Sequence, residues 1–251
     1  MGWVKRRAGL VLAVGLLLGL GWTAAVTTSM PNWFDPSEAC ALKLGGHDNP
    51  GGSAEVHTRW FPPAASCDFG DGDVRQYIST TRSTVLAVLG VLILVVLVTG
   101  LVLTVRRLTG APGEPRGAED VDLRRRKFNQ LAFGALDVLV VGAVLTFFNA
   151  AAVIFGGIPG GILFIVASIA GLSALGVALD RHTGPLPSTA LDSRRRGTVA
   201  GATVFAVIFA ATALTGQLPF FRLWSAPLGA VTYVVIAAVQ WSRLPHHETV
   251  N

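Results

Sequence analysis

Asp137 is the ionisable residue best placed to do chemistry, because it lies well inside a long apolar run of the sequence. If that run is in lipid, a charged carboxylate there is costly and is a functional candidate by default. One hypothesis makes Asp137 a proton or cation relay, together with Asn149. Their separation turns a straight helix by about 120°, so they do not line one track. The alternative, which the pattern favours, is a protonated or hydroxyl-bonded carboxyl that ties two helices together.

Cys40 and Cys67 are the only two cysteines, and they lie in a polar segment, residues 30–83, between two long apolar runs. On the oxidising side of a membrane, such a pair is expected to form a disulfide and not a metal site. The bond would stabilise this segment by about 3.5 kcal/mol, if it acts by constraining the unfolded chain.

Metal, cofactor and catalytic motifs are not apparent in the sequence. His47, Asp48, Glu55 and His57 match no usual spacing of metal ligands, and we interpret them as solvated loop residues. A P-loop, a nucleophile elbow and the HExxH and CxxC patterns do not occur. Catalysis needs several convergent polar groups, so the sequence favours a non-enzymatic protein without a cofactor or metal.

The composition predicts that lipid surrounds most of the chain. Hydrophobic residues make up 51% of the sequence and charged residues 14%, against about 25% charged residues in soluble domains. The apolar residues occur in blocks of about 20, which is the length that crosses a hydrocarbon core of roughly 30 Å. We therefore expect an all-α membrane protein, a six-transmembrane helix bundle with a small disulfide-closed, partly β external loop between helices 1 and 2.

The expected organisation follows the order of these blocks. It consists of a cytoplasmic N-terminus and first helix (1–29), an external loop domain (30–83), a second helix (84–105), a cytoplasmic linker (106–127), a hairpin of helices 3 and 4 (128–181), a cytoplasmic loop (182–197), a hairpin of helices 5 and 6 (198–241) and a cytoplasmic tail (242–251).

Basic residues fix the expected orientation. In this topology 15 of the 20 Lys and Arg residues are cytoplasmic, as the positive-inside rule requires, so both termini are expected inside a plasma membrane. The basic run 124–127 serves as an orientation signal, with binding of anionic lipid headgroups as the alternative. Topology thus accounts for the net charge of +5, and no nucleic-acid-binding pattern accompanies it.

The first apolar run follows Lys5, Arg6 and Arg7 and extends over residues 8–26. The apolar region of a secretory signal peptide is usually 7–15 residues long, so we expect an uncleaved membrane anchor. Cleavage after this run is the alternative.

The external loop has strand-like composition in residues 56–61 and 74–78, with a turn at Asp71-Gly72 and a strand end at Pro62-Pro63. Its aromatic and basic side chains are candidates for protein contacts. These candidates are Trp33, Phe34, Arg59, Trp60, Phe61 and Tyr77.

The order Cys40, then the run RWFPP at 59–63, then Cys67 and Tyr77 resembles the first external loop of uncharacterised actinobacterial multi-pass membrane proteins. The resemblance covers the first two spans and their loop, and it implies a family without an activity.

Two functions follow from these patterns. The first is an accessory or assembly component that lies in the lipid bilayer and uses its external loop to contact other membrane or envelope proteins. The alternative is a small proton-coupled transporter, or a subunit of one, that uses Asp137. No nucleic-acid partner is expected in either case.

Overall fold

The computed structural model describes residues 8–32, 35–44, 54–70, 72–117 and 121–243. The chain divides into two compact units. The N-terminal unit comprises Met1–Thr104 and Ala151–Leu163, and the C-terminal unit comprises Val105–Ala150 and Phe164–Asn251. Each unit has its own framework of contacts and is described separately.

The fold is mostly helical, as the sequence predicts, and five of the described helices are long and apolar enough to cross a membrane by length and composition. They are α2 (Ala8–Thr27), α4 (Thr80–Leu108), α5 (Leu123–Thr183), α6 (Ala190–Leu214) and α7 (Ser225–Ser242). The expected small β-structure is also present, as a sheet of three strands.

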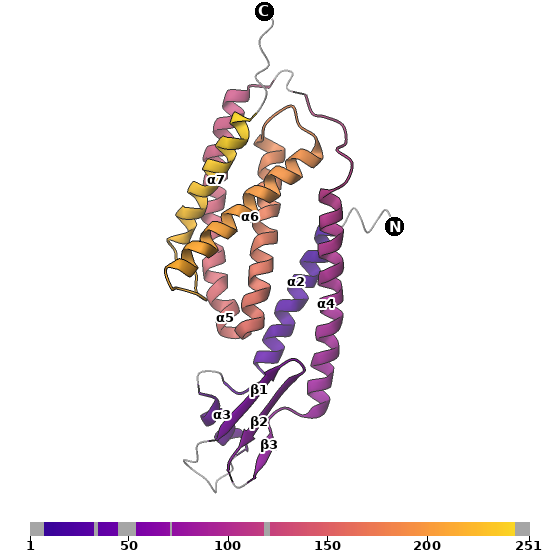
Figure 1. Cartoon of the computed structure of the whole chain (residues 1–251), viewed down its shortest axis with the longest axis vertical. Coiled ribbons are helices and arrows are strands. Elements are labelled where there is room, and N and C mark those ends of the chain that lie inside the picture. The colour runs from indigo at the N-terminus through magenta and orange to yellow at the C-terminus, as the bar shows by residue number, and fades with distance from the viewer. Residues whose placement is uncertain (1–7, 33–34, 45–53, 71, 118–120, 244–251) are drawn as a thin grey trace, which may run out of the picture. The chain divides into compact units, whose positions relative to one another are not determined.

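Helix α5 has 61 residues and is interrupted at Gly157, whose φ of 56° and ψ of −149° are not helical. The interruption lies in the glycine- and proline-containing stretch where the sequence predicts a connection between two spans. A positive φ is accessible to glycine at little cost, and Pro159 follows two residues after the break. The chain of α5 reverses there, so its two arms are antiparallel (Figure 1).

The sheet of the N-terminal unit has the antiparallel order β1-β2-β3 (Figure 1). Strand β1 (Glu55–Trp60) and strand β3 (Val74–Gln76) lie where strands are predicted, and β1 ends just before the two prolines. Strand β2 (Pro63–Asp68) was not predicted. Pro63 is its first residue and is paired with Trp60, a position where proline is tolerated in a strand.

Helix α3 (Pro36–Leu44) was not predicted either, since only loop and strands were expected in residues 30–83. The carboxylate of Asp35 accepts a hydrogen bond from the backbone N–H of Glu38 at 3.1 Å. This is N-cap behaviour, and proline is favoured in the first turn that follows. The sequence Asp-Pro-Ser-Glu was therefore an available signal for this helix.

Helices α2 and α4 approach each other closely in the N-terminal unit. The indole Nε1 of Trp22 donates a hydrogen bond to the carbonyl of Leu86 at 2.7 Å, and a Cβ atom at Gly100 would lie 2.8 Å from Cα of Leu12. A cluster of buried apolar side chains joins these helices to the sheet; its members are Val26, Met30, Ala65, Ile78 and Leu86.

The C-terminal unit contains both arms of α5 together with α6 and α7. At one end, Nε of Arg126 donates to the carbonyl of Gly184 at 2.7 Å and joins the start of α5 to the loop after it. In the interior, Nε1 of the buried Trp241 donates to Oε1 of Gln130 at 2.5 Å. This bond joins the last turn of α7 to the first arm of α5.

Candidate functional site

The predicted disulfide between Cys40 and Cys67 is confirmed. It joins α3 to β2 with a Cα–Cα distance of 5.9 Å, and both residues are fully buried. Half-buried Leu44, Val56 and Tyr77 pack around it. The disulfide therefore holds the helix and the sheet together as one small domain.

The predicted contact residues of this domain separate into surface and core positions. Arg59 and Phe61 are at the surface, and the Phe61 side chain is 52% exposed. Trp60 and Tyr77 are half-buried and pack against the apolar cluster beneath the sheet, while Nζ of Lys43 lies 3.7 Å from the centroid of the Tyr77 ring. Trp33 and Phe34 lie outside the described residues.

Trp60 also lies against the interruption in α5. A Cβ atom at Gly157 would be 2.6 Å from Cη2 of the Trp60 ring. Only a residue without a side chain leaves room for the indole at this distance, and the positive φ at Gly157 independently favours glycine. Trp60, which the sequence predicts as a partner contact, thus also packs against the backbone of its own chain.

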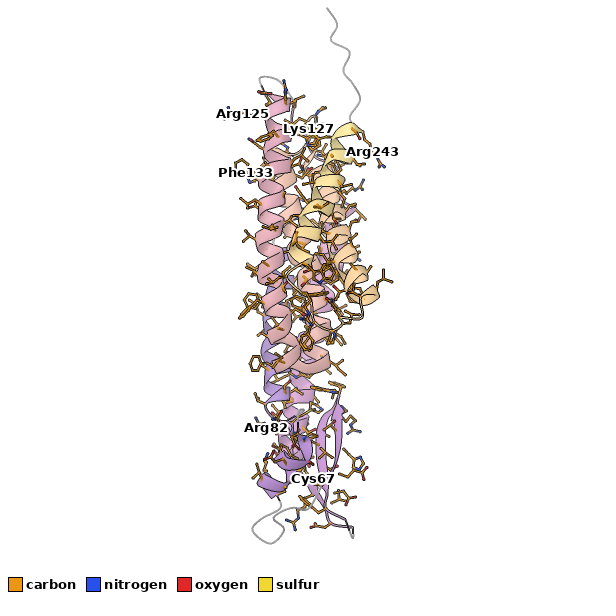
Figure 2. All side chains as sticks on the ribbon, turned by 90° about the vertical axis from the view of Figure 1, so that its left-hand side faces the viewer. Cys67, Arg82, Arg125, Lys127, Phe133 and Arg243 are labelled. Carbon is orange, nitrogen blue, oxygen red and sulfur yellow. A yellow bond between two sulfur atoms is a disulfide. The ribbon has the colours of Figure 1, made fainter. Side chains whose placement is uncertain are left out.

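Asp137 is exposed on α5, among apolar side chains that are exposed as well. Its neighbours on this face are Phe133, Leu136 and Val140, and Figure 2 shows Phe133 projecting from the same arm. The carboxylate makes no hydrogen bond with any residue that the structure describes. Among the described residues, the buried hydroxyl of Ser168 has no hydrogen-bond partner and does not reach Asp137 either.

Asn149 is placed differently, since its side chain is 3% exposed. Its Oδ1 accepts a hydrogen bond from the backbone N–H of Phe221 at 2.8 Å. The structure thus gives Asn149 a partner of its own and does not pair it with Asp137. The ring of Phe221 in turn contacts Phe164 and Phe205, with centroid distances of 5.9 and 6.1 Å.

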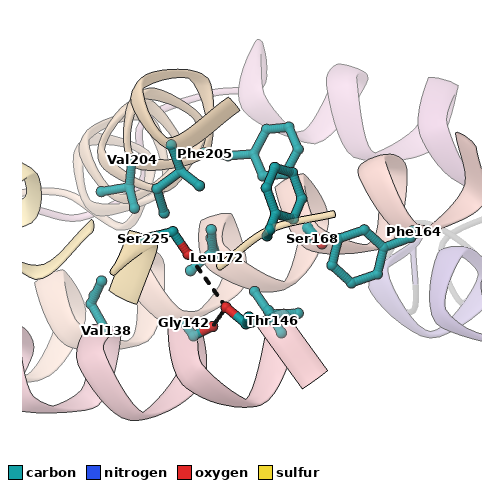
Figure 3. A pocket seen from close by; sticks show the side chains of 12 residues that line it. Val138, Gly142, Thr146, Phe164, Ser168, Leu172, Val204, Phe205 and Ser225 are labelled. Atoms are coloured by element: carbon teal, nitrogen blue, oxygen red, sulfur yellow. Dashed lines mark hydrogen bonds between the residues drawn. The ribbon is translucent and has the colours of Figure 1, made fainter. Parts of the chain in front are cut away.

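A small cavity lies beside this aromatic group in the C-terminal unit (Figure 3). Its volume is about 20 Å³, room for a single water molecule and too little for a substrate. The hydroxyls of Thr146 and Ser225 are 3.3 Å apart at its wall, and the buried hydroxyl of Ser168 also faces it. The 12 lining residues include no ionisable side chain, so the cavity lacks the groups that acid–base or nucleophilic chemistry requires.

Arginine side chains gather at the end of the C-terminal unit where α5 both begins and ends. Arg196 forms a two-point ion pair with Asp180, with both N–O distances at 3.0 Å. Nη2 of Arg116 donates to the hydroxyls of Ser188 and Ser193 at 3.0 and 2.7 Å. The sequence predicts a role for these basic residues in membrane topology, and the structure shows that Arg116 and Arg196 also hold parts of the fold together.

Two further carboxylates at this end cap helices. Asp122 accepts from the backbone N–H of Arg125 at the start of α5. Asp192 forms a capping box with Thr189 at the start of α6. Hydrogen bonds from the hydroxyl and backbone N–H of Thr189 lower the pKa of the Asp192 carboxyl.

Within the described residues, no group of three or more His, Cys, Asp and Glu side chains could hold a metal ion. Nε2 of His57 lies 3.8 Å from Oε1 of Glu55 on β1, and both side chains are largely exposed. His47 and Asp48 fall outside the described residues.

Comparison with known proteins found no matching family model, no matching curated protein and no matching solved structure.

Proposed function

We propose that this chain is a multi-pass plasma-membrane protein of the non-enzymatic type, an assembly component whose disulfide-closed domain contacts other membrane or envelope proteins. The two arms of α5 count as separate spans in this proposal, which gives six transmembrane helices. Both termini are cytoplasmic and the sheet is external. In this proposal the chain belongs with the uncharacterised actinobacterial multi-pass membrane proteins that its first external loop resembles.

The membrane part is supported by the surface of the long helices. Apolar side chains of α4 such as Val88, Leu89 and Val91 are exposed although they occupy different faces of the helix. Contiguous apolar surface of this extent is unfavourable in water and is matched by lipid tails.

The single observation that supports the assembly function is that the disulfide-closed domain exposes large apolar side chains. Helix α3 and the sheet are fixed by the cystine, yet Leu42, Phe61 and Val74 remain exposed at 80%, 52% and 51%. A rigid support that presents large apolar side chains is typical of a protein-binding surface, because no ordering cost is added on association. The exposed Arg59 beside Phe61 supplies a polar contact at the same edge.

Topology is tested first. Single cysteines introduced at Thr58 on β1 and at Arg124 on α5 are treated with a membrane-impermeant maleimide on intact cells. We expect labelling at position 58 and none at position 124 until the membrane is permeabilised. Labelling at 124 but not at 58 would contradict the orientation, and extraction of the protein by alkaline carbonate would contradict membrane insertion.

Protein contact is tested by a photo-cross-linking amino acid placed at Phe61. We expect a discrete adduct with a membrane or envelope protein, which disappears when Arg59→Glu is added. The matched control carries the cross-linker at Leu214, which is 88% exposed on α6. The same adducts from both positions, or none from position 61 under several growth conditions, would refute an assembly role for this surface.

The transport alternative keeps its own test. A proton relay requires the carboxyl of Asp137, so Asp137→Asn should abolish a proton-coupled flux while expression is unchanged. Wild-type flux in that variant would exclude the relay.

A further inference from the structure

Three arginines of the C-terminal unit, which we call the outer arginines, are Arg107, Arg181 and Arg194. Their side chains form no hydrogen bond or ion pair with any residue in the described part of the chain. Neighbouring contacts bring them together: Nε of Arg195 donates to the carbonyl of Leu108 at 3.2 Å, which joins the end of α4 to the start of α6.

The end of α5 is joined to the same place. The guanidinium of Arg116 donates to the carbonyl of Arg181, so the segment after α4 is bound to the last turn of α5. Arg107, Arg181 and Arg194 therefore come from three helix ends that meet within one unit. Burial is the main cause that lowers the pKa of the Arg194 guanidinium, and the positive charges of Arg107 and Arg181 lower it further.

Basic residues outnumber acidic ones in the segments that form this end of the unit. Residues 105–127 and 180–196 hold 11 Arg and Lys against six Asp and Glu. Asp180 is occupied by Arg196, and Asp122 and Asp192 cap helices. Among the described residues, the three outer guanidiniums have no carboxylate partner. Such a group can bind a phosphate, because each planar guanidinium can donate two hydrogen bonds to phosphate oxygens.

We propose that Arg107, Arg181 and Arg194 form a binding site for the phosphate of an anionic phospholipid headgroup. The inference rests on the proposed membrane location, since the three residues lie at the ends of apolar helices, at the depth of headgroups in a bilayer. Arg125, Lys127 and Arg243 lie at the same end of the unit (Figure 2) and add a diffuse attraction for anionic lipid. The three outer arginines provide the localised site.

The test uses the full chain purified in a neutral detergent, with phosphatidylglycerol and phosphatidylcholine titrated separately and bound lipid counted by native mass spectrometry. We expect a preference for phosphatidylglycerol. The double variant Arg107→Gln/Arg194→Gln should weaken that binding about 10- to 30-fold, since each basic residue contributes roughly one decade or slightly less. Arg107→Lys/Arg194→Lys should retain part of it, because the charge remains and the two-point geometry is lost.

The matched control is Arg124→Gln/Arg125→Gln, which removes the same charge from exposed positions at the same end. Equal losses in the two Gln pairs would overturn the site in favour of diffuse electrostatics. Equal binding of the two lipids would overturn it too, as would full displacement of phosphatidylglycerol by millimolar inorganic phosphate, which would identify free phosphate as the ligand. Membrane extraction of the same variants separates the outcomes. A protein that stays in the membrane but shows no lipid preference refutes this inference alone, and a protein that alkaline carbonate removes refutes the proposed function.

Discussion

Oδ1 of Asn149 lies 2.8 Å from the backbone nitrogen of Phe221 and accepts its hydrogen bond in the buried interior of the C-terminal unit. The bond ties the first arm of α5 to the connection between α6 and α7. It also positions the Phe221 ring between Phe164 and Phe205. Asn149, a candidate member of a proton relay in the sequence, therefore also holds this connection against α5.

Asn149→Leu should lower the free energy of unfolding by about 1–3 kcal/mol, because the buried N–H of Phe221 loses its acceptor. Chemical denaturation in detergent measures the change. Phe147→Leu is the control from the same helix, since that side chain is 74% exposed, and it should be close to wild type. Equal stability of Asn149→Leu and the control would show that the hydrogen bond contributes nothing.

Gly197→Ala should also destabilise the C-terminal unit. A Cβ atom there would collide with backbone atoms of Gly176 and Val177 on the second arm of α5. Overcrowding of this kind costs about 1–3 kcal/mol, because the two helices must separate. Gly171→Ala is the matched control, with no atom within 4 Å of its added Cβ, and should be neutral or slightly stabilising. Thermal unfolding measures the stability of both variants. A Gly197→Ala variant more stable than Gly171→Ala would be incompatible with the close approach of α5 and α6.

Removal of one partner of the ion pair should be costly, since the side chains of Asp180 and Arg196 are only 2% and 22% exposed. Asp180→Asn leaves a poorly solvated guanidinium without its counter-charge and should cost about 2–3 kcal/mol. The double variant Asp180→Asn/Arg196→Met should recover part of this loss, because the uncompensated charge is gone. Unfolding free energies of the two single variants and the double variant give the coupling, and strictly additive losses would mean that the pair does not interact.

The capping box at the start of α6 should be sensitive to acid. Hydrogen bonds from Thr189 hold the pKa of Asp192 below its ordinary value of 3.8. Their contribution is therefore complete above that value and is lost as the pH falls through the lower, folded-state pKa. Thr189→Val should cost about 1 kcal/mol at neutral pH, and this difference from wild type should shrink below pH 3.8.

Thr215→Val serves as the comparison, because the Thr215 hydroxyl donates to the carbonyl of Ala211 at 2.9 Å and to no titratable group. Its effect should not change with pH. A pH-independent penalty for Thr189→Val would show that the charge of Asp192 adds nothing to the cap. Melting temperatures measured at pH values between 3 and 7 distinguish these results.

Apolar periodicity and turn chemistry were sufficient to predict the long helices, because such runs admit few alternatives. The disulfide was also predictable, since the chain has only two cysteines. Strand β2 was not, because Pro63 and two alanines give it little strand propensity, and pairing with β1 and β3 imposes the extended conformation.

The candidate sites were less predictable than the fold. Phe221 lies in a segment that resembles a surface connection, and only tertiary contacts with Asn149 and two phenylalanines reveal that it is buried. Some arginines donate hydrogen bonds to backbone carbonyls, and others have no such bond within the described residues. Which arginines do so depends on how three helix ends come together in the fold. Residue type alone carries no such information.

The contact between Trp60 and Gly157 has a mechanical consequence. The indole belongs to the first strand of the cystine-closed domain, and the glycine is the pivot at which the longest helix reverses. A tilt of the sheet must therefore displace the ring or bend the pivot, because glycine leaves no compressible side chain between them. Because Phe61 directly follows Trp60, a partner bound at Phe61 would lie one residue from this contact.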